Sequence, residues 1–213
     1  ILNKATYSPC EVREENPTPL WRIRARRVIH DEEARVVHYE NATFEVFGVP
    51  VLWTPYFSHP DPTVDRATGF LAPSVLSSGE NFGYAVKTPF YLVIDDQTDL
   101  TVTPFVTTND GLLGEVELRR AFASGDAVFR GSLGRSDFAG ERQIHGHVDT
   151  EGRFAFGPKT RWGWDVKFAS DDAYLRYFDF STEDRLTSTA YVERYTRDSF
   201  LDLAAVRFQS LRA

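Results

Sequence analysis

The chain lacks methionine, has one cysteine among its 213 residues and contains no long uninterrupted hydrophobic run. Its longest apolar stretch, residues 46–57, is too short for a transmembrane helix and is broken by Pro50 and Pro55. The net charge of −7 and the pI near 5.3 argue against nucleic acid as a partner. A Gly-x-Ser-x-Gly motif, a phosphate-binding loop and a paired-cysteine metal site are also missing. We therefore expect a protein that is not an enzyme and uses no cofactor.

Neither an initiator methionine nor a signal peptide is recognisable, and residues 208–213 have the pattern of a strand interior. We interpret the sequence as an internal piece of a longer protein. In an exported protein the lone Cys10 indicates a partner cysteine elsewhere, whereas in a cytosolic protein it is usually a small buried hydrophobe.

Helical periodicity is nearly absent, and the first quarter of the chain predicts short strands at residues 20–30, 35–40, 43–47 and 49–53. Trp21, Ile23 and Ala25 alternate with arginines, which indicates one buried and one solvated face. The pattern is typical of the last strands of a sandwich or jellyroll. The arginines at 22, 24, 26 and 27 could meet lipid phosphates, but the glutamates at 32, 33 and 40 can neutralise them, so we favour a solvated face.

From Thr68 onward the strands become longer and follow one another with short polar breaks, and nine or ten of them fit into residues 68–213. Their second faces carry full charges, which is typical of a membrane barrel with a wet lumen, although a soluble sandwich also alternates. We expect Trp162, Trp164 and Phe168 to face lipid. Their polar counterparts on the lumen side are Arg161, Asp165 and Lys167. On one face of a strand at 81–94 we place Phe82, Tyr84, Val86, Phe90 and Leu92. An interfacial aromatic set is expected at Tyr91, Phe105, Phe122, Phe154, Phe156 and Trp162.

A proline-rich stretch separates the two patterns. Residues 48–73 carry five prolines among β-forming residues, and proline is excluded from the middle of a soluble sheet. This stretch predicts a junction between two β-units: residues 1–57, a junction at 58–67, and residues 68–213.

The junction and its flanks resemble the lipopolysaccharide-assembly family LptD, also known as the organic-solvent-tolerance family. The resemblance is carried by residues 48–73, Tyr7-Ser-Pro-Cys10, Pro19–Asp31, Tyr39–Glu45, Lys87–Tyr91 and Thr98–Pro104. It implies an all-β fold in which the end of a periplasmic β-jellyroll precedes the first antiparallel strands of a large outer-membrane β-barrel. The implied function is non-catalytic transport of lipopolysaccharide into the outer leaflet. The implied partners are lipopolysaccharide, the membrane, the plug lipoprotein of the translocon and the periplasmic bridge protein.

The resemblance also implies roles for individual residues. Pro73 and Pro89 would loosen the seam between the first and last barrel strands so that it opens as a lateral gate, although they could be ordinary edge or bulge prolines. Cys10 would form a disulfide with a cysteine outside this sequence. A jellyroll with an apolar interior would guide the acyl chains, and our candidates for this path are Val28, Val36, Phe44, Val46, Val49, Val51 and Trp53.

Three alternatives stay open at this point. His145 and His147 share one strand face and, with Asp149, could form a metal site, but polar lumen residues explain them more simply. The chain could belong to a passive porin or small outer-membrane barrel. It could also be a soluble β-sandwich binding module.

Overall fold

The computed structural model describes residues 1–8, 19, 21–61, 63–64, 66–78, 81–136 and 143–212. Cys10 lies outside these residues. The described chain is all-β apart from one short helix, and its contacts divide it into two units, Ile1–Gly69 and Phe70–Ala213. Within the described part, no helix has the length and apolar character needed to cross a membrane.

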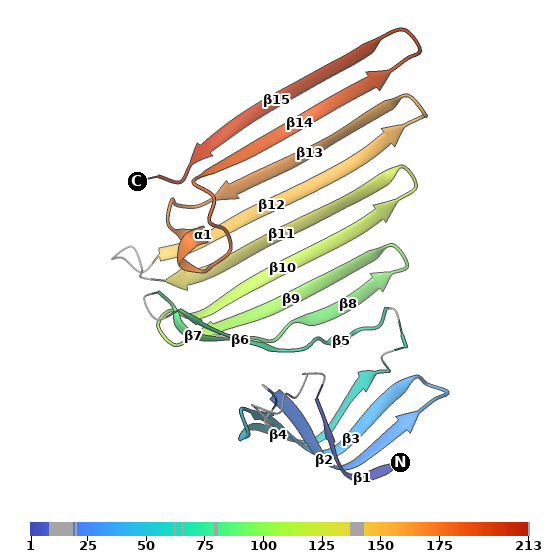
Figure 1. Ribbon diagram of the computed structural model, residues 1–213, viewed down its shortest axis with the longest axis vertical. Coiled ribbons are helices and arrows are strands. Elements are labelled where there is room, and N and C mark those ends of the chain that lie inside the picture. Colours follow the sequence, from blue (N-terminus) through green and yellow to red (C-terminus); the bar gives the residue numbers. More distant parts are fainter. Residues whose placement is uncertain are drawn as a thin grey trace. The chain divides into compact units, whose positions relative to one another are not determined.

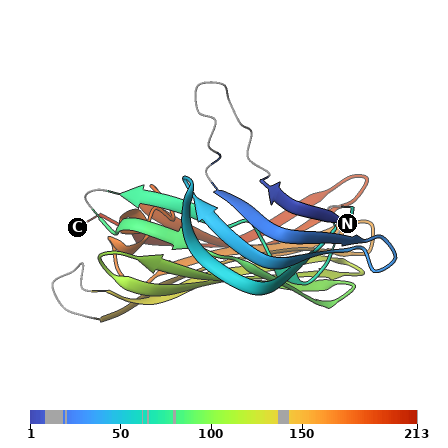
Figure 2. The same ribbon diagram turned by 90° about the horizontal axis from the view of Figure 1, so that it is seen from below.

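The first unit is a four-stranded antiparallel sheet in the order β1-β2-β3-β4 (Figure 1). Its strands are β1 (Leu2–Tyr7), β2 (Trp21–Asp31), β3 (Val36–Val46) and β4 (Val49–Pro60). Figure 2 shows how strongly β2, β3 and β4 curve along their length. The two short strands predicted at 35–40 and 43–47 are one strand, because Asn41 adopts a positive φ of 50° without ending the ladder. β4 also continues seven residues past the predicted end at Trp53, since an edge strand tolerates proline.

The alternation predicted for β2 is confirmed. Trp21, Ile23 and Ala25 are buried with Tyr39 and Ala42 in the core of the first unit. The opposite face carries the arginines, but their main partner is an acid that the sequence analysis did not name. Arg22 and Arg24 donate to Glu45 at 2.6 and 3.2 Å, whereas the predicted Glu40 lies 3.6 Å from Arg27.

Glu45 is a buried acid of this unit, with 6% of its side chain exposed. Burial raises the pKa of the Glu45 carboxyl, but the hydrogen bonds and charges of Arg22 and Arg24 outweigh it and hold this pKa below its ordinary value. A depressed folded-state pKa contributes stability above the unfolded-state pKa, and this stability is lost as the pH falls through the folded-state pKa.

The second unit is an 11-stranded antiparallel sheet, mostly a meander of neighbouring hairpins (Figure 1). Its first strands are interrupted: β5 (Gly69–Phe70), β6 (Ser74–Ser78), β7 (Gly83–Lys87) and β8 (Phe90–Asp95). The following strands are long: β9 (Thr98–Thr107), β10 (Gly111–Phe122), β11 (Gly125–Ser136), β12 (Gln143–Phe156), β13 (Thr160–Ala169), β14 (Arg185–Tyr195) and β15 (Phe200–Ser210).

The ladder register confirms the predicted faces of the long strands. Glu117 pairs with Arg130, and its neighbour Leu118 pairs with Phe129, so charged and apolar residues alternate across β10 and β11. Asp149 pairs with Lys167, and Val148 pairs with Phe168, in the same way. Directly paired residues share a face, which therefore stays polar or apolar from strand to strand.

Three aromatic assignments were wrong. The predicted strand at 81–94 is split at residues 88–89, and Phe82 lies before β7 rather than on a shared face with Tyr84. The Phe82 ring packs against Phe105, and both are fully buried. Tyr91 is also buried and shares a face with Thr101. Phe82 and Phe105 are buried there because a connection that the sequence did not reveal packs on them.

That connection joins β13 to β14 and contains the helix α1 (Tyr174–Tyr177). Tyr174 and Phe178 are buried against Phe82, Phe105 and Leu113 of the sheet. The largest core of the second unit therefore forms between this connection and the sheet.

We predict that Glu45→Gln weakens the protection of β2 and β3 amides against hydrogen exchange by about 1–3 kcal/mol at pH 7, because it removes two charge-assisted hydrogen bonds. The loss should disappear as the pH falls below the folded-state pKa of Glu45. Hydrogen exchange across a pH series measures both effects.

The matched control is Glu40→Gln, whose ion pair with Arg27 joins two side chains that are about 40% exposed. Loss of such an exposed pair should weaken the protection of the amides by less than about 1 kcal/mol. Equal effects of the two substitutions at pH 7 would contradict the assignment.

Candidate functional site

The polar face of the second unit is the face on which the connection with α1 packs. A row of ion pairs crosses it from β9 to β12. Arg119 bonds Asp99 at 2.8 Å, and Arg130 bonds Glu117 at 2.9 Å and Glu151 at 3.2 Å. Each acid lies on a strand next to its arginine, so the row links four consecutive strands. These side chains are between one tenth and one half exposed, which makes the face wet and ionic.

The opposite face is apolar and exposed. Its large side chains include Tyr84, Val86, Val102, Val106, Leu112, Leu118, Phe129, Leu133, Ile144, Phe156, Trp162 and Phe168. A monomeric soluble protein rarely exposes a contiguous apolar patch of more than a few hundred Å². A surface that runs over β7 to β13 therefore indicates a membrane or another apolar environment.

The two histidines of β12 lie on the polar face, as predicted, and hydrogen-bond to different groups. His147 Nδ1 lies 2.6 Å from Ser132 Oγ, and His145 Nδ1 lies 2.8 Å from a carboxylate oxygen of Asp171. Asp149, the proposed third metal ligand, lies 3.9 Å from Arg130 instead. In the part of the chain that the structure describes, no three His, Cys, Asp or Glu side chains are arranged to hold a metal ion.

The connection containing α1 is hydrogen-bonded to the polar face at several points. The Tyr174 hydroxyl lies 2.7 Å from Ser132 Oγ, and the Tyr177 hydroxyl donates to Asp110 at 3.0 Å. Burial raises the pKa of Tyr174 to about 12, so this hydroxyl keeps its proton at physiological pH. Sequence reasoning missed the connection, although the aromatic residues between 174 and 180 were a usable signal.

The two gate candidates lie at breaks in the first strands of the sheet. Pro73 precedes β6, and Pro89 separates β7 from β8. The Pro89 carbonyl accepts a hydrogen bond from the Leu71 amide at 2.9 Å, and the Thr88 amide donates to the Pro104 carbonyl at 3.3 Å. The carbonyls of Pro89 and Pro104 thus accept hydrogen bonds at the break. Pro73, Pro89 and Pro104 themselves supply no amide donor.

The register is kept across this break. Lys87 pairs with Phe105, and Phe90 pairs with Val102, so both strands advance by three residues. β7 and β8 therefore follow one line along β9, with a local loss of hydrogen bonds and no inserted residue.

The residues proposed for the acyl-chain path do not all share one face of the first unit. Val28, Phe44 and Val46 pack against its core. Trp53 is 60% exposed and pairs with Thr43, which pairs with Arg24, so it lies on the arginine face. Val49 and Val51 are also exposed, and Val36 pairs with Asp31.

Long antiparallel strands with one apolar and one ionic face are the pattern of outer-membrane β-proteins. Residues 143–213 match the family model described as LPS transport system D, LptD. Most of the chain also aligns with proteins named LPS-assembly protein LptD. The chain belongs to the LptD family.

Its relatives are considerably longer. The chain is 30% identical to the LptD protein of Idiomarina loihiensis over 181 residues, which are 84% of this chain and 23% of that protein. It is 34% identical to that of Photobacterium profundum over 140 residues, covering 66% of this chain and 17% of the relative. It is 38% identical to that of Pseudoalteromonas atlantica over 119 residues, which are 55% of this chain and 15% of the relative. The chain thus spans less than a quarter of these proteins.

We predict that Tyr174→Phe combined with Tyr177→Phe loosens the connection by about 1–3 kcal/mol, because two hydroxyl hydrogen bonds are lost while both rings stay. Hydrogen exchange at the amides of residues 174–181 should accelerate accordingly. Tyr195→Phe is the control, since its hydroxyl bonds Glu193 at an exposed strand end. Unchanged exchange in the double variant would show that ring packing alone holds the connection.

Proposed function

We propose that this chain forms part of a lipopolysaccharide transporter of the outer membrane. In this proposal residues 1–57 are the end of a periplasmic jellyroll, 58–67 the junction, and 68–213 the first strands of a transmembrane barrel. The observation that carries the proposal is the sheet of the second unit, whose one face is ionic and whose other face is exposed and apolar. Membership of the LptD family supports it.

The two faces match the two halves of the transported molecule. An amphipathic glycolipid needs an apolar surface for its acyl chains and a hydrated one for its sugars. In the proposal the apolar face of the sheet meets lipid, the ionic face lines the lumen, and the apolar side of the first unit accompanies the acyl chains. The plug lipoprotein and the periplasmic bridge protein are proposed partners of the whole protein.

The lengths of the connections indicate which end of the sheet lies towards the periplasm. The connections after β8, β10, β12 and β14 are two to four residues long, whereas those at the opposite end, after β9, β11 and β13, have three, six and fifteen residues. Outer-membrane barrels have short periplasmic turns and longer extracellular loops. We therefore assign the short turns to the periplasm, the end at which β5 begins (Figure 1).

The gate is part of the proposal. Because Pro73 and Pro89 supply no backbone donor at the breaks beside β6, β7 and β8, we infer that this edge of the sheet is paired less tightly than its middle. A seam between this edge and the last barrel strand would open there at the lowest free-energy cost.

We predict that Trp164→Arg impairs assembly in the outer membrane, since an arginine on the lipid face near the membrane centre costs about 2–4 kcal/mol. Trp164 stacks with Phe154 at 5.6 Å on the apolar face. Lys167→Ala, on the polar face, loses only a partly exposed pair with Glu183 and should cost less than about 1 kcal/mol. Equal amounts of both variants in isolated outer membranes would show that the face assignment is inverted.

We further predict that Pro73→Ala with Pro89→Ala restores up to two ladder hydrogen bonds, worth together about 1–3 kcal/mol. The seam would then open about 5- to 150-fold less often. Folding should be intact, while lipopolysaccharide delivery falls and sensitivity to large hydrophobic antibiotics rises.

The control for the proline variant is Pro158→Ala, in the turn after β12. It removes a proline without changing a ladder. If the double variant reaches the membrane at normal abundance and the permeability barrier is unaffected, the two prolines are ordinary edge residues.

A further inference from the structure

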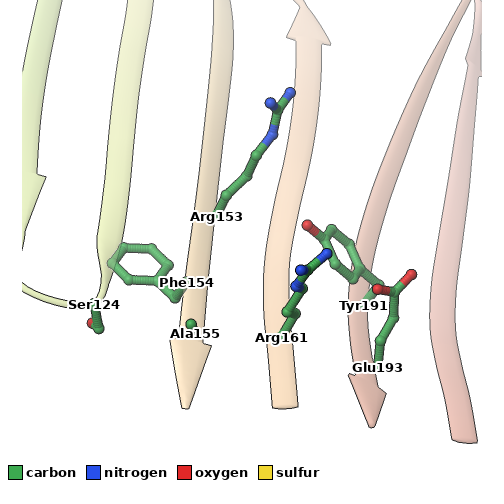
Figure 3. Close-up of a pocket in the computed structure, with 7 residues that line it drawn as sticks. All are labelled: Ser124, Arg153, Phe154, Ala155, Arg161, Tyr191 and Glu193. Atoms are coloured by element: carbon green, nitrogen blue, oxygen red, sulfur yellow. The ribbon is translucent and has the colours of Figure 1, made fainter. Parts of the chain in front are cut away.

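A pocket of about 400 Å³ lies on the polar face at the short-turn end of β12, β13 and β14 (Figure 3). Its charged and hydroxyl-bearing lining residues are Ser124, Arg153, Arg161, Tyr191 and Glu193. Figure 3 shows that Arg153, Arg161 and Tyr191 project from three neighbouring strands. The row of ion pairs from Asp99 to Glu151 described above involves none of these lining residues.

The pocket lies where each of two cross-strand rows contains one small residue among large ones. One row is Ala155, Arg161 and Glu193, and the other is Arg153, Gly163 and Tyr191. A Cβ atom on Gly163 would lie 2.3 Å from the Gly152 carbonyl and 2.9 Å from the Tyr191 hydroxyl. No side chain fits there, so the glycine leaves room for the tyrosine and for a ligand above it.

The two arginines have spare hydrogen-bonding capacity. The Arg153 side chain is 74% exposed, and its one described ion pair, at 3.3 Å, is with Glu151, which also binds Arg130. Arg161 forms no ion pair within the described residues. Glu193 accepts a hydrogen bond from Tyr195 at 3.0 Å. A guanidinium carries five donors arranged to bind phosphate or carboxylate oxygens in pairs.

We propose that this pocket binds an anionic sugar group, a phosphate or carboxylate attached to a saccharide, as the glycolipid enters the lumen. The arginines bind the anion, the Tyr191 ring offers a flat surface to the sugar, and Glu193 accepts from its hydroxyls. The volume is in the range of small-ligand pockets, and larger than a bare phosphate needs. This inference rests on the proposed function, because it takes the polar face to be the sugar path.

The test places a photoreactive phenylalanine analogue at Tyr191 of the full-length protein in living cells. Irradiation should yield an adduct that antibodies to lipopolysaccharide detect. Arg153→Gln with Arg161→Gln should reduce this adduct by about fivefold or more at equal protein abundance, since charge-assisted hydrogen bonds are lost. Replacing both arginines by lysine should restore part of it, because the charge is kept.

Two controls separate charge from position. Lys159→Gln with Arg194→Gln removes two positive charges at the same end of the sheet, outside the pocket lining, and should leave the adduct unchanged. The photoreactive residue at Trp162, on the apolar face of β13, should give no adduct that depends on the arginine pair.

A probe at Thr189, two residues from Tyr191 on the same strand, separates this inference from the proposed function. An adduct at Thr189 without one at Tyr191 overturns the subsite and leaves the transport function standing. Absence of lipopolysaccharide adducts at both positions overturns both proposals. An adduct at Tyr191 with protein alone, or one insensitive to the arginine pair, also overturns the subsite.

Discussion

The structure of the second unit depends on strand register. Side chains alternate with a period of two, so a slip by one residue would place Glu117 and Arg130 on the apolar face and Leu118 and Phe129 on the polar one. The ion pairs between adjacent strands oppose such a slip, because each arginine meets its acid only in the observed register. Individually these partly exposed pairs contribute little stability. Their arrangement over four strands instead specifies which residues pair.

The first strands of the second unit keep their register but have fewer backbone donors. At Thr88 and Pro89 the register along β9 is kept, but the prolines at 73, 89 and 104 cannot donate. The strands there are held by the remaining bonds, including those from Leu71 to Pro89 and from Thr88 to Pro104. A sheet with one weakly paired edge can change its pairing there while its middle stays intact. That property suits the proposed gate and would be a liability in a soluble protein, whose edges must resist association.

Much of this architecture could be predicted from the sequence because it follows from local patterns. Alternation gave the faces of β10, β11 and β13, and the turn residues gave most of the breaks. The errors arose where distant segments meet. By alternation Phe105 shares the polar face of β9 with Thr101 and Thr103, yet it is buried because Phe178, seventy-three residues later, packs on it. Neither the register of Glu45 with Arg22 nor the rows that form the arginine pocket could be read from one strand alone.

The two ends of the polar face differ in a way that bears on the proposed sugar path. At the long-connection end, Tyr174, Phe178 and Phe180 cover the sheet with aromatic rings, and the hydroxyls of Tyr174 and Tyr177 bind Ser132 and Asp110. At the short-turn end, Arg153 and Arg161 remain exposed beside an open pocket. A saccharide entering from the short-turn end would first meet donors suited to its anionic groups and would later have to pass or displace the aromatic connection. The polar face would thus bind sugar at entry and restrict it towards the exit, while the apolar face stays in contact with lipid throughout.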